Sequence, residues 1–198
     1  MNRKALKSRA KEQLRGKWGY SALATIIMMA VISAGMAMPF LGRAIGAILT
    51  PILAYGITYY HLQISRGLNP EITDLFAGFN YFAVVLVAGL LMSIFTSLWT
   101  MLFVIPGIIA AIKYSFTYYI IIDNPGISAL EAINISKQMT YGHKWDIFVL
   151  DLSFIGWLFL SSLTCGIGLF WLIPYMNVTY SNLYNNLKLG MQNQNIYG

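Results

Sequence analysis

The chain has 198 residues, of which 58% are hydrophobic and only 10% are charged, and its mean hydropathy is +0.63. Soluble domains carry about 25% charged residues, so this composition excludes an ordinary water-facing surface. The apolar residues come in blocks long enough to cross a bilayer, and spanning helices satisfy their own backbone polar groups in lipid. The sequence therefore predicts an all-α, polytopic membrane helix bundle.

The net charge of +6 is concentrated near the N-terminus. Seven of the thirteen basic residues precede the first apolar block: Arg3, Lys4, Lys7, Arg9, Lys11, Arg15 and Lys17. A basic cluster beside a spanning segment usually sets topology and attracts anionic headgroups. We therefore expect a cytoplasmic N-terminus beside a bilayer with anionic headgroups at the inner face, and no nucleic-acid partner.

Residues 1–17 also carry Leu6, Ala10 and Leu14 at four-residue spacing. This pattern predicts a basic amphipathic helix on the cytoplasmic face of the membrane. A disordered basic tail that only orients the first span is the alternative. The small residues at 35–37 resemble a signal-peptide cleavage site, but further apolar segments follow, which favours an uncleaved first span.

Residues 18–187 are expected to form one transmembrane domain of about six spanning helices, arranged as three helical hairpins. The expected spans are 18–40, 45–65, 79–104, 107–122, 145–164 and 167–187, and residues 188–198 follow as a cytoplasmic tail. Pro106-Gly107 is the expected outer turn of the middle hairpin. The fourth span is short, and if it is re-entrant, the odd number of crossings places the C-terminus outside.

The distribution of basic residues supports six crossings with both termini in the cytoplasm. The segments expected inside hold the N-terminal cluster, Arg66, Lys137, Lys144 and Lys188, whereas the outer turns hold only Arg43. This asymmetry follows the positive-inside rule.

Two polar segments separate the hairpins. Residues 66–78 are expected to be a polar loop, and residues 123–144 form the longest polar segment inside the chain. Within it, Ser128 and Glu131 have the spacing of a capping box, and Gly142 is well placed to end a helix. The pattern predicts a short cytoplasmic helix over 128–141, either a docking surface or a connector lying on the bilayer.

Short motifs recur in the three expected hairpins. Thr58-Tyr59-Tyr60, Thr117-Tyr118-Tyr119 and Thr179-Tyr180 occupy their second helices, preceded by Gly46, Gly107 and Gly168. A threefold repeat of one hairpin explains this recurrence. Short apolar motifs also coincide by chance, so both interpretations stand.

Lys113 and Asp151 are ionisable residues inside expected spans. A charge within a span is costly and marks a candidate functional site. The long lysine side chain bridges the expected difference in depth, so we predict a Lys113–Asp151 pair. In a functional role, such a pair lines a polar pathway or holds an anionic headgroup. In a structural role, it is a buried pair or a snorkelling lysine that fixes the register of the helices.

Motifs for enzymatic chemistry are missing from the sequence. It has no phosphate-binding glycine loop, no His-Glu-x-x-His and no nucleophile elbow. One cysteine, Cys165, excludes an intrachain disulfide and a cysteine-based metal cluster, and two histidines give little material for a metal site. We therefore expect no catalytic residue, no metal, no cofactor and no enzymatic activity.

A series of motifs spans nearly the whole chain. They are Gly16-Lys17-Trp18-Gly19, Leu98-Trp99, Ile105-Pro106-Gly107-Ile108, Lys113-Tyr114-Ser115, Asp123-Asn124-Pro125, Gly142-His143-Lys144, Leu152-Ser153-Phe154-Ile155-Gly156-Trp157 and Pro174-Tyr175. In this order they resemble a bacterial integral membrane family, domain-of-unknown-function family 975, found mainly in Gram-positive bacteria. The resemblance implies a multi-pass protein of the bacterial cytoplasmic membrane whose activity is not established, and it transfers no catalytic or binding residues.

Two functions are consistent with these features. The first is an accessory, interaction or self-protection factor in the cytoplasmic membrane, which binds a membrane-protein partner or a second copy of itself. It rests on the basic surface helix, the capped inner helix and the few charges inside spans. The alternative is a small transporter or channel for a solute or lipid, with a polar path near Lys113 and Asp151 and mid-span Pro51 and Pro174.

Overall fold

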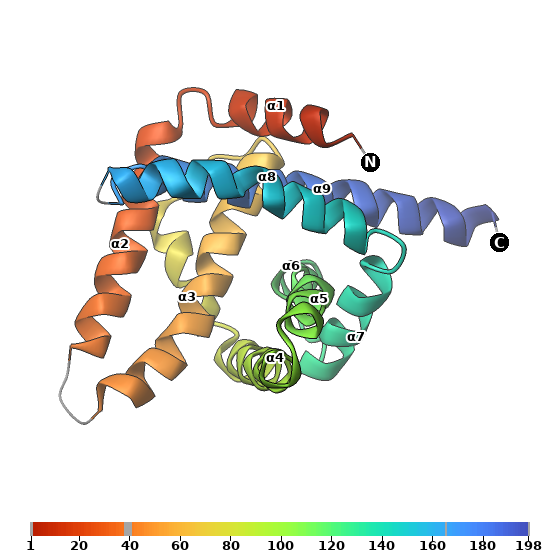
Figure 1. Ribbon diagram of the computed structural model, residues 1–198, viewed down its shortest axis with the longest axis horizontal. Coiled ribbons are helices and arrows are strands. Elements are labelled where there is room, and N and C mark those ends of the chain that lie inside the picture. The colour runs from red at the N-terminus through yellow and green to blue at the C-terminus, as the bar shows by residue number, and fades with distance from the viewer. Residues whose placement is uncertain (1, 38–40, 165, 198) are drawn as a thin grey trace.

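A computed structural model describes residues 2–37, 41–164 and 166–197, and within these ranges it contains helices and no strand (Figure 1). The predicted all-α class is therefore confirmed. The elements are α1 (Arg3–Gln13), α2 (Trp18–Met36), α3 (Gly42–Ser65), the 3₁₀ helix η1 (Ile72–Phe79), α4 (Phe82–Leu102), α5 (Val104–Tyr114), α6 (Thr117–Asp123), α7 (Ala129–Met139), α8 (Lys144–Leu163) and α9 (Leu169–Tyr197). The predicted end of the first span at Pro39 and Phe40, and Cys165, lie outside the described residues.

Five segments are long and apolar enough to cross a membrane: α2, α3, α4, the continuous stretch Val104–Asp123 that holds α5 and α6, and α8. This supports the prediction of a membrane protein. The predicted sixth span corresponds to α9, which is not among the five. The second half of α9 is rich in asparagine and glutamine, residues that are rare in lipid-facing helices because their amides need hydrogen-bond partners.

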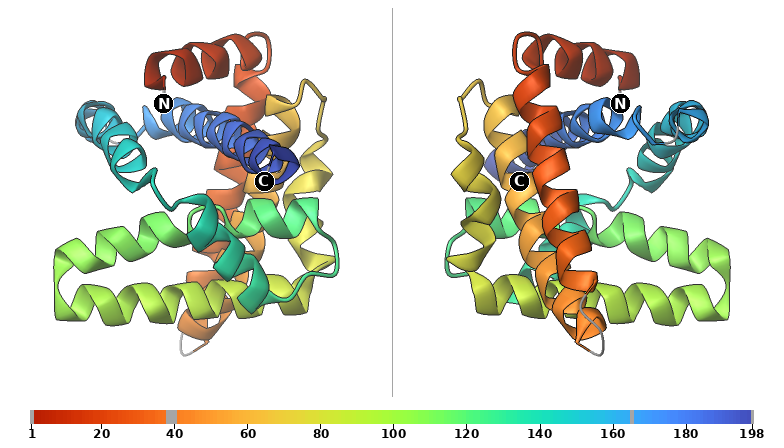
Figure 2. Two further views of the ribbon diagram at one scale, coloured as in Figure 1. Left: turned by 90° about the vertical axis from the view of Figure 1, so that its right-hand side faces the viewer. Right: turned by 90° about the vertical axis from the view of Figure 1, so that its left-hand side faces the viewer.

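Neighbouring helices pair as three hairpins (Figures 1 and 2). The first hairpin is α2 with α3, the second is α4 with α5 and α6, and the third is α8 with α9. Figure 2 shows that the turns of the three hairpins point in different directions. Helices that cross one bilayer are tilted by only about 20° on average, so the structure does not confirm the predicted arrangement of about six spanning helices.

The third hairpin lies across the first hairpin rather than beside it. Thr164 and Gly168, at its turn, line the same groove as Lys11 and Trp18 of the N-terminal segment. The six-span layout places these two regions on opposite sides of the membrane. They are neighbours here because α9 packs along α1, α2 and α3 and buries Asn182 there, leaving 1% of this residue exposed.

Helix α1 carries the four-residue apolar spacing seen in the sequence. Leu6, Ala10 and Leu14 are buried, and α1 packs mainly against α9. Protein, not lipid, therefore covers this apolar face. A position of α1 on the cytoplasmic surface of the membrane stays a prediction.

The second hairpin turns at Phe103, which has extended backbone angles of φ −157° and ψ 147°. The predicted turn at Pro106-Gly107 is therefore wrong by about one helical turn. Pro106 lies in the first turn of α5, where a helix needs no backbone N–H. Gly107 instead allows close packing, because a Cβ there would lie 2.2 Å from the Thr100 Oγ1 atom on α4.

The predicted polar loop at 66–78 contains η1, which packs on α3. Leu75 of η1 is 1% exposed. A Cβ at Gly56 of α3 would lie 1.7 Å from the Leu75 carbonyl oxygen, and one at Gly78 would lie 2.3 Å from the Ile52 carbonyl oxygen. Backbone contact through two glycines explains why this polar sequence is ordered on the helix.

The capped helix predicted over 128–141 is α7. The Ser128 side chain accepts a hydrogen bond from the Glu131 backbone N–H at 3.3 Å, which satisfies one free donor of the first turn. Gly142 follows the helix with φ +80°. Ile133 and Met139 are buried, whereas Leu130 is exposed, so one face of α7 belongs to the core.

Replacing Gly56 with alanine tests the contact between α3 and η1. We expect Gly56→Ala to lower the free energy of unfolding by about 1–3 kcal/mol, because the added methyl group forces the two backbones apart. Gly19→Ala in α2 is the matched control, since a Cβ there meets no atom within 4 Å. Thermal unfolding in detergent micelles, followed by tryptophan fluorescence, measures both variants; equal midpoints would contradict the packing.

Candidate functional site

Asp123, the last residue of α6, lies at the centre of a buried polar cluster. Its side chain is 6% exposed, with Arg66 Nη2 at 2.8 Å and Lys188 Nζ at 2.6 Å from its carboxylate oxygens. The Tyr184 hydroxyl donates a third hydrogen bond at 2.8 Å. We call Asp123, Arg66, Lys188 and Tyr184 the Asp123 cluster. It joins the second helices of all three hairpins, at the C-terminal ends of α3 and α6 and in the second half of α9.

Local structure explains why this carboxylate needs two cations. Asp123 lies at the C-terminal end of α6, where the helix dipole disfavours a negative charge. Burial adds the larger cost of removing the carboxylate from water. Arg66 is the C-cap residue of α3, a position where a cation is favoured, and Lys188 reaches the same oxygens from α9.

A second set of hydrogen bonds joins α1 to the neighbourhood of the cluster. The Gln13 side chain donates to the Ser65 carbonyl oxygen at 2.7 Å and accepts from Asn182 at 2.7 Å. Asn185 donates to the Ser65 hydroxyl at 3.1 Å. These amides connect α1, α3 and α9 through uncharged contacts, so the polar residues of α9 pair with protein groups.

Aromatic rings pack directly beside the cluster. Tyr119 and Tyr184 stack with ring centroids 5.0 Å apart, and Phe116 lies 5.9 Å from the Tyr184 ring. Phe116 is fully buried. Among the described residues, four buried side-chain atoms have no hydrogen-bond partner: Oγ of Ser21, Nε2 of His61, Oγ1 of Thr117 and Oδ1 of Asn182. The carboxylate is therefore paired with two cations and a tyrosine hydroxyl, and the Tyr184 ring packs among further aromatic rings.

The two site residues predicted from the sequence have separate surroundings. Asp151 accepts a hydrogen bond from the Tyr180 hydroxyl of α9. The backbone oxygen of Lys113 accepts one from Ser136 of α7 at 2.8 Å. Among the described residues, no ion pair joins Lys113 to Asp151. The structure does not bring the two residues together, and a functional role for either stays a prediction.

The orientation of α8 accounts for this separation. Lys144, Trp145 and Phe148, in its first turns, line one groove with Ile109 and Ile112 of α5. Asp151 is almost one turn further along α8 and points to α9 instead. In the part of the chain that the structure describes, no group of three His, Cys, Asp or Glu side chains is arranged to hold a metal ion.

Sequence reasoning missed the Asp123 cluster. The sequence indicates Arg66 and Lys188 only as basic residues of the inner face, and Asp123 only as the first residue of a polar segment. One signal was available, because the chain has only seven acidic residues and Asp123 directly follows an apolar run. An acid in that position needs a cationic partner if it is buried, but the sequence alone does not show that it is buried.

Replacing Asp123 with asparagine tests the cluster. We expect Asp123→Asn to destabilise the fold by about 3 kcal/mol, the lower end for breaking a buried pair, because Arg66 and Lys188 keep partial access to solvent. The control is Asp146→Asn, at a more exposed site whose contacts include Arg3 at 3.8 Å. Exposed ion pairs contribute less than about 1 kcal/mol each, so this change should cost less than Asp123→Asn. Thermal unfolding compares the two; similar midpoints would show that the cluster does not hold the hairpins together.

A comparison with protein families shows which family the chain belongs to. The model of a family described as "Protein of unknown function (DUF975)" matches residues 1–112 and 101–190. No curated protein and no solved structure gave a significant match. The two matched ranges cover most of the chain, including every residue of the Asp123 cluster. The chain therefore belongs to the DUF975 family, whose function is unknown.

Proposed function

We propose that this protein is a non-enzymatic accessory or self-protection factor of the bacterial cytoplasmic membrane, which acts by contact with another membrane protein. The observation that carries the proposal is the exposed apolar end of the second hairpin. Met101, Phe103, Val104 and Ile105 are 89%, 73%, 67% and 71% exposed. An apolar surface of this kind is covered either by lipid or by a partner.

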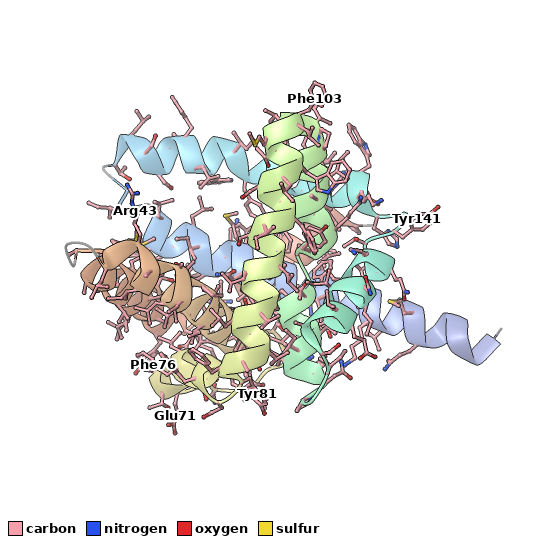
Figure 3. All side chains as sticks on the ribbon, turned by 90° about the horizontal axis from the view of Figure 1, so that it is seen from below. Arg43, Glu71, Phe76, Tyr81, Phe103 and Tyr141 are labelled. Carbon is pink, nitrogen blue, oxygen red and sulfur yellow. The ribbon has the colours of Figure 1, made fainter. Side chains whose placement is uncertain are left out.

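The second hairpin extends away from the rest of the molecule. Figure 3 shows Phe103 at one end of α4 and Tyr81 at the other, beside η1. Only 11% of the most apolar part of α4 is buried, compared with 61% for α3. The hairpin therefore packs against the rest of the protein at the Tyr81 end, whereas most of α4 and the turn at Phe103 are exposed.

The charged groups support a role in contact rather than in chemistry. The carboxylates of Asp123 and Asp151 bind cations and tyrosine hydroxyls within the fold. Reactive acids in enzymes lie in clefts where a substrate can reach them. Here the buried acids hold helices together, and the large exposed surface is apolar.

The transporter or channel alternative rests on Lys113 and Asp151. Each is half-buried. The Asp151 carboxylate accepts a hydrogen bond from Tyr180 of α9, and the Lys113 backbone oxygen accepts one from Ser136 of α7. No observation in the structure favours a path between them over a structural role for each. A solute flux that Lys113→Met abolishes without loss of stability would favour this alternative.

Photo-crosslinking in intact cells tests the proposal. With benzoylphenylalanine at Phe103, we expect a discrete protein adduct, because this exposed side chain lies at the proposed contact. An adduct with the mass of two copies would identify the partner as the protein itself. The matched control is the same probe at Tyr141, which is 78% exposed but lies in the turn between α7 and α8.

The outcome separates protein contact from lipid contact. Adducts at Phe103 and none at Tyr141 are the expected result. If Phe103 gave adducts with lipid alone, or if both positions captured the same protein, the second hairpin would not be the contact surface.

A further inference from the structure

An aromatic groove opens between the N-terminal segment and the third hairpin. It has a volume of about 350 Å³, and its walls include Trp18, Trp157, Leu160, Trp171 and Tyr175, with Lys11 at its edge. Three of the five tryptophans of the chain line it. Pockets of a few hundred Å³ with apolar walls and few polar groups are typical of ligand sites.

One lysine amine, that of Lys11, lies at the edge of this groove, and a second, that of Lys7, lies over a ring that packs against the groove wall. Lys11 Nζ is 5.6 Å from the centroid of the Tyr175 ring, and Lys7 Nζ is 4.1 Å from that of Phe154. The two rings meet edge to face at 5.6 Å. Lys7 and Lys11 are four residues apart on α1, so their charges point to the same aromatic pair.

These two cations have no carboxylate partner among the ion pairs of the described residues, which involve Arg3, Arg66 and Lys188. Lys7 donates only to Ser153, through its hydroxyl and carbonyl oxygens. Partial burial and the neighbouring charge of Lys11 lower the pKa of the Lys7 amine. A ligand with a negative group would relieve the repulsion between the two amines.

The outer wall of the groove is open to the surroundings of α8 and α9. Trp157, Leu160 and Trp171 are 55%, 54% and 50% exposed. They belong to the apolar surface that a membrane would cover, so an acyl chain has direct access to the groove. Its polar end would then meet α1, the most basic segment of the chain.

We propose that the aromatic groove binds one anionic phospholipid from the bilayer. The acyl chain packs between Trp18, Trp157 and Trp171, and the phosphate lies against the amine of Lys11 at the edge of the groove, with Lys7 one turn away on α1. Basic pockets beside membrane helices bind anionic headgroups by this combination of charge and apolar contact. The bound lipid joins α1 to the third hairpin and so stabilises the crossing of that hairpin over the first.

Tryptophan quenching tests this site in the full chain. Trp99 and Trp145 lie outside the groove, so in a Trp99→Phe, Trp145→Phe background all remaining tryptophans report on the groove. The protein is reconstituted in vesicles with brominated phosphatidylglycerol or brominated phosphatidylcholine. We expect half-quenching at an about fivefold lower fraction of phosphatidylglycerol, given the usual contribution of one lysine near an anionic lipid.

Matched lysine variants separate a specific site from general attraction to the membrane surface. Lys11→Gln should abolish the preference for phosphatidylglycerol, whereas Lys4→Gln, an exposed position on the same helix, should keep it. Lys7→Gln provides a second test if Lys11→Gln does not fold by circular dichroism. Equal quenching by both lipids in the parent protein, or an equal loss in Lys4→Gln and Lys11→Gln, would overturn the proposal.

Discussion

One buried carboxylate constrains the arrangement of the hairpins. Asp123 is almost inaccessible to solvent and lies at the unfavourable end of a helix dipole. Its charge is tolerated only because Arg66 and Lys188 approach from two other helices. Arg66 caps α3, Asp123 ends α6, and Lys188 lies in the second half of α9. The cluster therefore holds the second helices of the three hairpins together, whereas it does not constrain the direction of their turns.

The position of α9 follows from the same constraint. Lys188 and Tyr184 hold it to the cluster, while Asn182 and Asn185 pair with Gln13 and Ser65. A helix with this many polar contacts is more stable against protein than against lipid. The third hairpin therefore lies across the first hairpin, and the groove with its three tryptophans forms where the two meet.

The individual helices were predictable because apolar length and capping residues are local properties. The five helices that are able to span a membrane, and α7, lie within a few residues of their predicted ranges, whereas α9 continues to Tyr197, beyond the predicted end of the sixth span at 187. Gly107 lies inside α5 and permits close packing against Thr100 instead of forming the predicted turn. Gly168 lies in the turn of the third hairpin and packs against Ser161. The arrangement of the hairpins could not be predicted from the sequence, because an apolar helix face packs equally well against lipid and against protein. The same ambiguity concealed the burial of Asp123, and the predicted Lys113–Asp151 pair is not among the ion pairs of the described residues.

The crossing of the third hairpin is the central claim, and a cysteine cross-link between its turn and α1 tests it most directly. In a Cys165→Ser background in native membranes, Lys11→Cys with Thr164→Cys should react with a short bis-maleimide, because both positions line the same groove. Lys11→Cys with Phe103→Cys, at the end of the second hairpin, should not. An upright six-span bundle would place Lys11 and Thr164 on opposite sides of the membrane, so failure of the first pair to cross-link, with both cysteines accessible, would contradict the account.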